Sequence, residues 1–166
     1  GEDVFYYLTL YNENYPMPAM PTSPVNGLDI PAGIVEGLYP WAPAPAVDGP
    51  AATILFSGPM WSVAVEAQRL LAEHYGVGAQ LWSATSYQQL RVEALAVERW
   101  NGMHPTEAPR VPRVTQLLER SAGPITAVTD FMRLVPDQIS RWSPRRFTSL
   151  GTDGFGRSDT REALRP

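Results

Sequence analysis

The sequence has no cysteine and no lysine, and it contains only two histidines in 166 residues. Without cysteine the chain forms no disulfide, no thiolate zinc site and no cysteine nucleophile. Without lysine it has neither a phosphate-loop lysine nor a lysine that could form a Schiff base. These absences exclude several classes of covalent and phosphate-transfer chemistry.

Positive charge is also scarce, and long apolar runs are missing. Thirteen arginines against seventeen acidic residues give a formal net charge of −4. That balance argues against nucleic-acid or membrane-surface binding, which needs a basic field. No apolar run reaches the roughly 18 residues that span a bilayer, and no signal-peptide pattern opens the chain. We therefore expect neither nucleic-acid nor membrane partners, and a reducing, cytoplasmic location.

The proline content divides the chain. Residues Val4–Tyr11 are aromatic and β-branched and predict one buried strand, which needs a sheet to join. The following stretch is rich in Pro, Gly and Ala and lacks periodicity, which is typical of a linker. We therefore expect a lone strand in residues 1–21, a linker in 22–51 and a folded domain in 52–166.

Strands and helices alternate in the predicted domain. This alternation indicates an α/β fold with a mostly parallel sheet covered by helices on both faces. Strands are expected at Thr53–Phe56, Ala79–Ala84, Ile125–Thr129 and Phe147–Leu150, and helices at Val63–Tyr75, from the cap Ser86 to Arg99, at Val114–Arg120 and around Met132–Arg141.

Few residues are candidates for chemistry. Ser57, Ser83 and Ser86 fall near strand ends, where doubly wound folds bind ligands, but none lies in a G-x-S-x-G sequence. Glu98 and Asp130 could act as acids or bases, but the sequence does not bring them together. We therefore predict no catalytic, cofactor-binding or metal-binding residue in this chain.

The two histidines and a glycine-rich segment remain. His74 is expected in the last turn of a helix, where a cation suits the helix dipole. His104 lies in a loop, where it either stabilises the loop by hydrogen bonds or makes a functional contact. The segment Gly151–Gly156 has the spacing G-x-x-G-x-G, which favours a tight turn over a phosphate cradle.

Several segments resemble one protein family, in the family's order. They are Glu2–Pro21, Tyr75–Gly78, Trp82–Tyr87, Glu98–Asn101, His104–Pro105, Pro109–Pro112 and, most specifically, Leu150–Arg161 with its GTDGFGRSD sequence. This pattern is similar to the C-terminal region of the homodimeric bacterial pyruvate dehydrogenases that depend on thiamine diphosphate, within the transketolase superfamily. Pro16 departs from it, because relatives commonly have histidine there.

The resemblance implies a transketolase-type C-terminal domain of about five strands, with residues 1–21 ending a pyrimidine-binding-type domain. It implies a non-catalytic part of an enzyme that passes a two-carbon acyl or ketol unit to a lipoyl group or other carrier thiol. Thiamine diphosphate and Mg²⁺ would be bound by upstream domains of a dimer, not by this chain alone. The alternative is a stand-alone docking module of a split assembly, with acyl-carrier or acyltransferase partners.

In both cases the C-terminal loop is the candidate contact surface. Asp153, Phe155, Arg157 and Asp159 alternate with glycine, which suggests a turn fixed by charge-assisted hydrogen bonds. The alternative is that Asp153 and Arg157 only satisfy each other.

Overall fold

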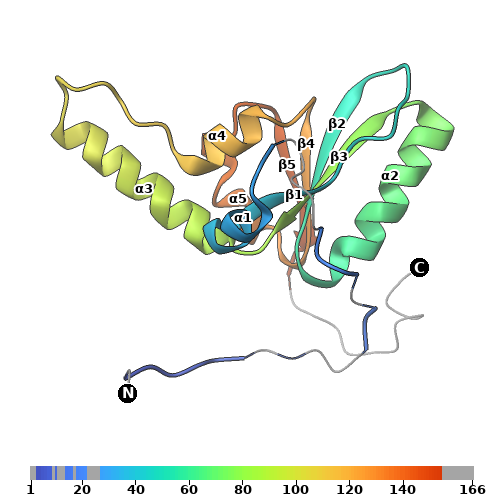
Figure 1. Ribbon diagram of the computed structural model, residues 1–166, viewed down its shortest axis with the longest axis horizontal. Coiled ribbons are helices and arrows are strands. Elements are labelled where there is room, and N and C mark those ends of the chain that lie inside the picture. Colours follow the sequence, from blue (N-terminus) through green and yellow to red (C-terminus); the bar gives the residue numbers. More distant parts are fainter. Residues whose placement is uncertain (1–2, 9, 11–13, 17, 22–26, 155–166) are drawn as a thin grey trace.

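A five-stranded sheet forms the centre of the computed structural model, which describes residues 3–8, 10, 14–16, 18–21 and 27–154 (Figure 1). The strand order is β1-β3-β2-β4-β5. Strands β2 to β5 run parallel, and β1 pairs antiparallel with β3 at one edge. The strands are β1 (Leu38–Ala42), β2 (Ala51–Phe56), β3 (Gly78–Ala84), β4 (Ile125–Met132) and β5 (Phe147–Thr152).

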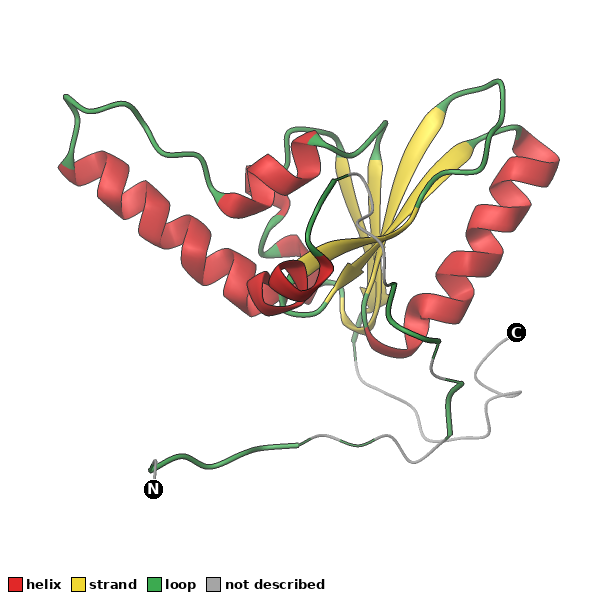
Figure 2. Cartoon of the chain, in the orientation of Figure 1, coloured by secondary structure: helices red, strands yellow, loops and turns green. Residues whose placement is uncertain are grey.

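Helices cover both faces of this sheet (Figure 2). Helix α2 lies on one face, and α3 and α4 lie on the other. The helical elements are α1 (Ile30–Glu36), the 3₁₀ turn η1 (Gly58–Met60), α2 (Trp61–Tyr75), α3 (Tyr87–Met103), α4 (Arg113–Glu119), α5 (Leu134–Asp137) and the 3₁₀ turn η2 (Ser140–Trp142). None of the described helices is both long and apolar enough to cross a membrane.

Strand periodicity separates the core into two clusters. In β2, Ile54 and Phe56 pack in the cluster that contains Ala64 of α2, whereas Leu55 packs in the cluster of α3 and α4. Successive side chains of a strand point to opposite faces, so a short run of apolar residues supplies both cores. The expectation of an α/β domain with a mostly parallel sheet is thereby confirmed.

The helix ends follow local sequence signals. The Ser86 side chain caps α3 by accepting a hydrogen bond from the Gln89 N–H, as predicted. Gly76 ends α2 in the left-handed conformation, and His74 lies in the last turn of that helix. Helix α3 continues beyond the expected Arg99 to Met103, while the helix expected around residues 132–141 is reduced to the short elements α5 and η2.

The N-terminal third differs from two expectations within the described chain. The described residues of the predicted strand Val4–Tyr11 are irregular and exposed, and no strand of the described chain pairs with them, so a strand completed by another sheet stays a prediction. The segment expected to be a linker contains α1 and β1, and β1 is hydrogen-bonded into the sheet. Proline is tolerated in β1 because an edge strand leaves one side of its backbone unpaired. The division of the chain into domains stays a prediction.

A candidate ligand cavity at the carboxyl edge of the sheet

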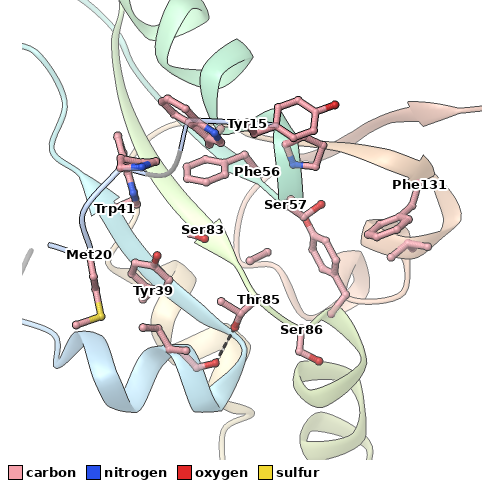
Figure 3. Close-up of a pocket in the computed structure, with 18 of the residues that line it drawn as sticks. Tyr15, Met20, Tyr39, Trp41, Phe56, Ser57, Ser83, Thr85, Ser86 and Phe131 are labelled. Atoms are coloured by element: carbon pink, nitrogen blue, oxygen red, sulfur yellow. Dashed lines mark hydrogen bonds between the residues drawn. The ribbon is translucent and has the colours of Figure 1, made fainter. Parts of the chain in front are cut away.

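A cavity of about 840 Å³ opens where β2, β3 and β4 end (Figure 3). The strand topology explains its place. The chain leaves β2 toward α2 on one face, whereas the neighbouring strand β3 leads to α3 on the other face. Connections that diverge in this way leave a crevice at the carboxyl ends of the strands, where open α/β sheets bind ligands. The volume lies within the range of small-molecule sites, roughly 300–1,000 Å³.

Aromatic side chains form much of the cavity wall. Trp41 of β1 meets Phe56 of β2 edge to face, with ring centroids 5.8 Å apart, and lies 6.4 Å from the ring of Trp61 at the start of α2. Tyr39 and Phe131 complete the described aromatic lining together with Tyr15 and Tyr87. Such walls suit a flat, apolar group.

The N-terminal segment supplies part of the wall. Tyr15, Pro16, Pro18, Ala19 and Met20 line the cavity, and Figure 3 shows Tyr15 and Met20 at its rim. Pro16, the residue that departs from the resemblance, therefore lies beside this cavity, where it contributes apolar surface.

The three serines noted from the sequence all reach the cavity lining. The buried Ser57 hydroxyl donates to the Thr129 hydroxyl at 2.8 Å, which joins the ends of β2 and β4. Ser86 accepts from the Gln89 N–H at 3.1 Å, so its own proton remains available to a ligand. The Ser83 side chain makes no hydrogen bond to another described residue. The position of these serines near predicted strand ends thus indicated hydroxyl groups that line this cavity.

Gly37 holds the turn after β3 that carries Ser86. Its carbonyl accepts hydrogen bonds from the N–H groups of Thr85 and Ser86, at 2.9 and 3.1 Å. Its φ of 102° is in the left-handed region, and a Cβ at this position would lie 2.6 Å from the Ser86 carbonyl oxygen. Only glycine combines this backbone conformation with such a close approach.

Tyr87 is the unusual polar group of the cavity. It is the first residue of α3, lines the cavity and is only 4% exposed. Its hydroxyl is buried and has no hydrogen-bond partner in the described structure. Burial raises the pKa of the Tyr87 phenol, so the hydroxyl stays protonated and is a donor at neutral pH. A buried polar group without a partner is rare and costs stability, so it needs an explanation.

The chain does not gather ionised groups in this cavity. No Asp, Glu, Arg or His belongs to the described lining, and no group of three or more metal-ligating side chains occurs in the described residues. Thiamine diphosphate with Mg²⁺ needs oxygen ligands for the metal and donors for a multiply charged diphosphate. The described residues therefore do not fit that cofactor.

His104 lies away from the cavity, at the end of α3. Its backbone N–H and its ring Nδ1 contact the carbonyl oxygen of Trp100, the ring nitrogen at 2.8 Å, and its ring stacks on the Trp100 indole at 4.3 Å. The Arg110 guanidinium lies 3.6 Å from the centre of the Trp100 ring. These contacts support the loop-stabilising alternative for His104.

Further contacts fix what we call the α3–α4 projection, residues 98–113, which extends away from the sheet in Figure 1. Asn101 exchanges two hydrogen bonds with the Arg110 backbone, at 2.9 and 2.8 Å. At its base, Arg113 pairs with Glu36 of α1, and its N–H donates to Glu93 at 2.8 Å. Glu98 pairs with Arg141 and accepts from the Trp142 indole N–H at 2.8 Å.

The predicted contact loop is only partly described. Asp153 forms an ion pair with Arg133 at 2.9 Å. Arg133 directly follows β4, so this pair ties the start of the loop to the sheet. Phe155, Arg157 and Asp159 lie outside the described residues.

Sequence reasoning missed the aromatic wall and Tyr87. Trp41 fell in the expected linker, and an unpaired hydroxyl is a property of the tertiary structure. From the sequence, Tyr87 could be placed only as the first residue of the helix that Ser86 caps, and nothing local indicated that its hydroxyl would lack a partner.

Together, the fold and the cavity define a doubly wound α/β domain with a ligand-type crevice at its carboxyl edge. Residues 37–166 match the model of the transketolase-like TK C-terminal domain. The chain belongs to this family.

Relatives of the whole chain agree with that assignment. It is 46% identical over 164 residues to the pyruvate dehydrogenase E1 component of Mycolicibacterium smegmatis, an alignment covering 99% of this chain and 17% of the relative. It is 41% identical over 165 residues to the E1 components of Pseudomonas aeruginosa and of Escherichia coli K12, covering 99% of this chain and 18% of each relative. The chain thus spans less than a fifth of the length of these relatives.

Proposed function

We propose that this chain is the non-catalytic C-terminal part of a thiamine diphosphate-dependent enzyme of the pyruvate dehydrogenase E1 type. The supporting observation is an identity of 41–46% that extends over 99% of the chain, including its N-terminal segment. The enzyme would pass a two-carbon acyl or ketol unit to a lipoyl group or another carrier thiol. Cofactor and metal would be held by catalytic domains that this chain contacts.

Exposed apolar residues of the N-terminal segment support a contact of this kind. Val4, Phe5, Tyr6, Tyr7, Leu8 and Leu10 are 59–91% exposed. Apolar side chains gathered in this way mark an interaction surface. This run of aromatic and aliphatic residues fits a strand that is completed by another sheet. We propose that this sheet belongs to the catalytic part, in a dimeric and cytoplasmic assembly.

The proposal that this chain is non-catalytic can be tested with two proteins: the isolated chain, and a catalytic part from which this chain has been removed. The chain alone should show no thiamine-dependent decarboxylation of pyruvate, and adding it to the catalytic part should restore two-carbon transfer. Turnover by the pure chain would refute the proposal. Light scattering of the mixture would show whether the two parts associate.

A pair of substitutions tests the contact surface. Phe5→Ser with Tyr7→Ser should weaken association with the catalytic part at least tenfold, because it removes two of the exposed aromatic side chains. The control is Tyr75→Ser, at another well exposed tyrosine, at the end of α2. Equal affinities of the two variants would place the contact elsewhere.

The docking-module alternative differs in how the parts are joined. If the catalytic part is a separate subunit, the chain should bind it reversibly and with a measurable Kd. If both parts lie on one polypeptide, the separate pieces should bind weakly and the fused protein should be active.

A further inference from the structure

The geometry points to the carboxyl-edge cavity as a binding site for a small monocarboxylate with a flat, apolar body. The inference does not rest on the proposed enzyme function. It rests on a cavity of suitable size, on aromatic walls and on a set of donors at the N-terminus of α3.

The donors lie together at one end of the cavity. The N–H groups of Tyr87 and Gln88 begin α3, a helix of seventeen residues, and have no acceptor in the described structure. A long helix carries a partial positive charge at this end. The Ser86 hydroxyl proton, which the capping hydrogen bond leaves free, adds another donor.

The Tyr87 hydroxyl is the independent sign of a ligand. Tyr87 lines the cavity and its hydroxyl is buried, yet no protein atom of the described chain accepts the hydroxyl proton. A carboxylate oxygen beside it would supply the missing acceptor and form a charge-assisted hydrogen bond.

The charge of the ligand follows from what lines the cavity. No arginine or histidine belongs to the described lining, so a dianionic phosphate would lack a counter-charge. No acidic side chain belongs to it either, so a single negative charge meets no repulsion. The rings of Trp41, Phe56 and Trp61 would cover the apolar body.

Three fluorinated probes with one ring test this specificity. We would titrate the chain with 4-fluorobenzoate, 4-fluorobenzamide and 4-fluorophenyl phosphate and follow each by ¹⁹F NMR near neutral pH. Titration to about 10 mM covers the affinity expected of ligands this small. The benzoate should bind saturably, and the neutral amide and the dianionic phosphate at least fivefold more weakly. Equal binding of the three probes, or no saturable binding of the benzoate, would overturn the inference.

Two variants locate the bound probe. Tyr87→Phe removes only the hydroxyl and should weaken 4-fluorobenzoate binding about tenfold, with little effect on the amide. Tyr75→Phe alters an exposed tyrosine at the end of α2, beside the start of β3 and outside the cavity lining, and should change nothing. Ser83→Leu narrows the cavity without breaking a hydrogen bond between described residues and should abolish binding. Circular dichroism would confirm that each variant is folded. Unchanged binding by either Tyr87→Phe or Ser83→Leu would overturn the assignment of the probe to this cavity.

Discussion

The carboxyl-edge cavity and the α3–α4 projection use polar residues in opposite ways. In the projection, Asn101, His104 and Arg110 contact one another or Trp100, and these contacts fix a loop. In the cavity, the Tyr87 hydroxyl is buried and unpaired beside aromatic walls. Helix α3 joins the two regions, with the cavity at its first residue and the projection at its last turns.

This comparison distinguishes polar side chains that stabilise the fold from those that can still bind a ligand. A polar side chain with a partner in its own chain has already exchanged water for that partner, and little binding energy remains. A buried donor without a partner keeps its full capacity for a ligand. By this criterion the contacts of His104 favour a structural role. Tyr87, which no sequence pattern singled out, marks the candidate site.

The largest effect is expected from changing the turn beneath the cavity. Gly37→Ala places a Cβ 2.6 Å from the Ser86 carbonyl oxygen and 3.1 Å from Leu90, at a φ of 102°. We expect the free energy of unfolding to fall by about 3 kcal/mol, because backbone strain and a steric clash combine. Urea unfolding followed by circular dichroism measures this loss.

Gly76→Ala is the matched control for that substitution. Gly76 also has a positive φ, of 62°, but a Cβ there would meet no atom within 4 Å. It should therefore cost only about 1 kcal/mol, the strain of the left-handed conformation. Equal losses for the two variants would show that the close approach of Gly37 to Ser86 is unimportant.

A smaller effect is expected at the far end of α3. Asn101→Ala removes both hydrogen bonds to the Arg110 backbone and should cost about 1–2 kcal/mol of local stability. Hydrogen exchange should increase in residues 104–112, while binding of 4-fluorobenzoate stays unchanged. Thr106→Ala, at an exposed position in the same loop, serves as the control. Reduced probe binding by Asn101→Ala would mean that the two ends of α3 are coupled.

A substitution in the cavity should not lower the free energy of unfolding, unlike the substitutions at Gly37 and Asn101. Tyr87→Phe deletes a buried hydroxyl that has no partner, so the free energy of unfolding should stay the same or rise by up to about 1 kcal/mol. Thermal and urea unfolding, compared with those of Tyr75→Phe, provide the measurement. A clear loss of stability would show that the hydroxyl is satisfied within the protein in solution.

Much of the fold could be predicted from local sequence because local signals and tertiary structure agree there. The apolar run Thr53–Phe56 became the centre of the sheet, and Ser86 caps the helix it was expected to cap. The edge strand β1 was missed because Pro40 and its neighbouring prolines resemble a linker. Its pairing with β3 depends on residues about forty positions away in the sequence.

The candidate site could be predicted only in outline. Serines at strand ends indicated the edge of the sheet where the cavity lies, because parallel strands bring their carboxyl ends together. Whether Tyr87 finds a partner depends on side chains from several elements, which no local pattern encodes. The same reasoning applies to the exposed segment around Phe5, whose apolar pattern predicts a strand but not the sheet that completes it.

The smallest expected effect concerns the ion pair that ties α3 to η2. The Arg141 guanidinium, and then the Trp142 indole N–H, hold the pKa of Glu98 below its ordinary value. A lowered folded-state pKa stabilises the fold above the unfolded pKa, and this contribution is lost as pH falls through the folded value. Glu98→Gln should therefore be slightly less stable than the original chain near neutral pH, with the difference vanishing in acid. The difference should remain small because the pair is exposed to solvent.

An Arg141→Gln background isolates the cause of that difference. Removing the guanidinium leaves only the Trp142 hydrogen bond to favour ionised Glu98, so most of the pH-dependent difference should disappear. High salt should have a similar effect on the original pair, since screening weakens exposed charges. Thermal unfolding of the four chains from neutral to acidic pH completes a double-mutant cycle. If the Glu98→Gln difference persists unchanged in the Arg141→Gln chain, the indole and not the arginine carries the interaction. The attachment of α3 to η2 would then depend on a neutral donor.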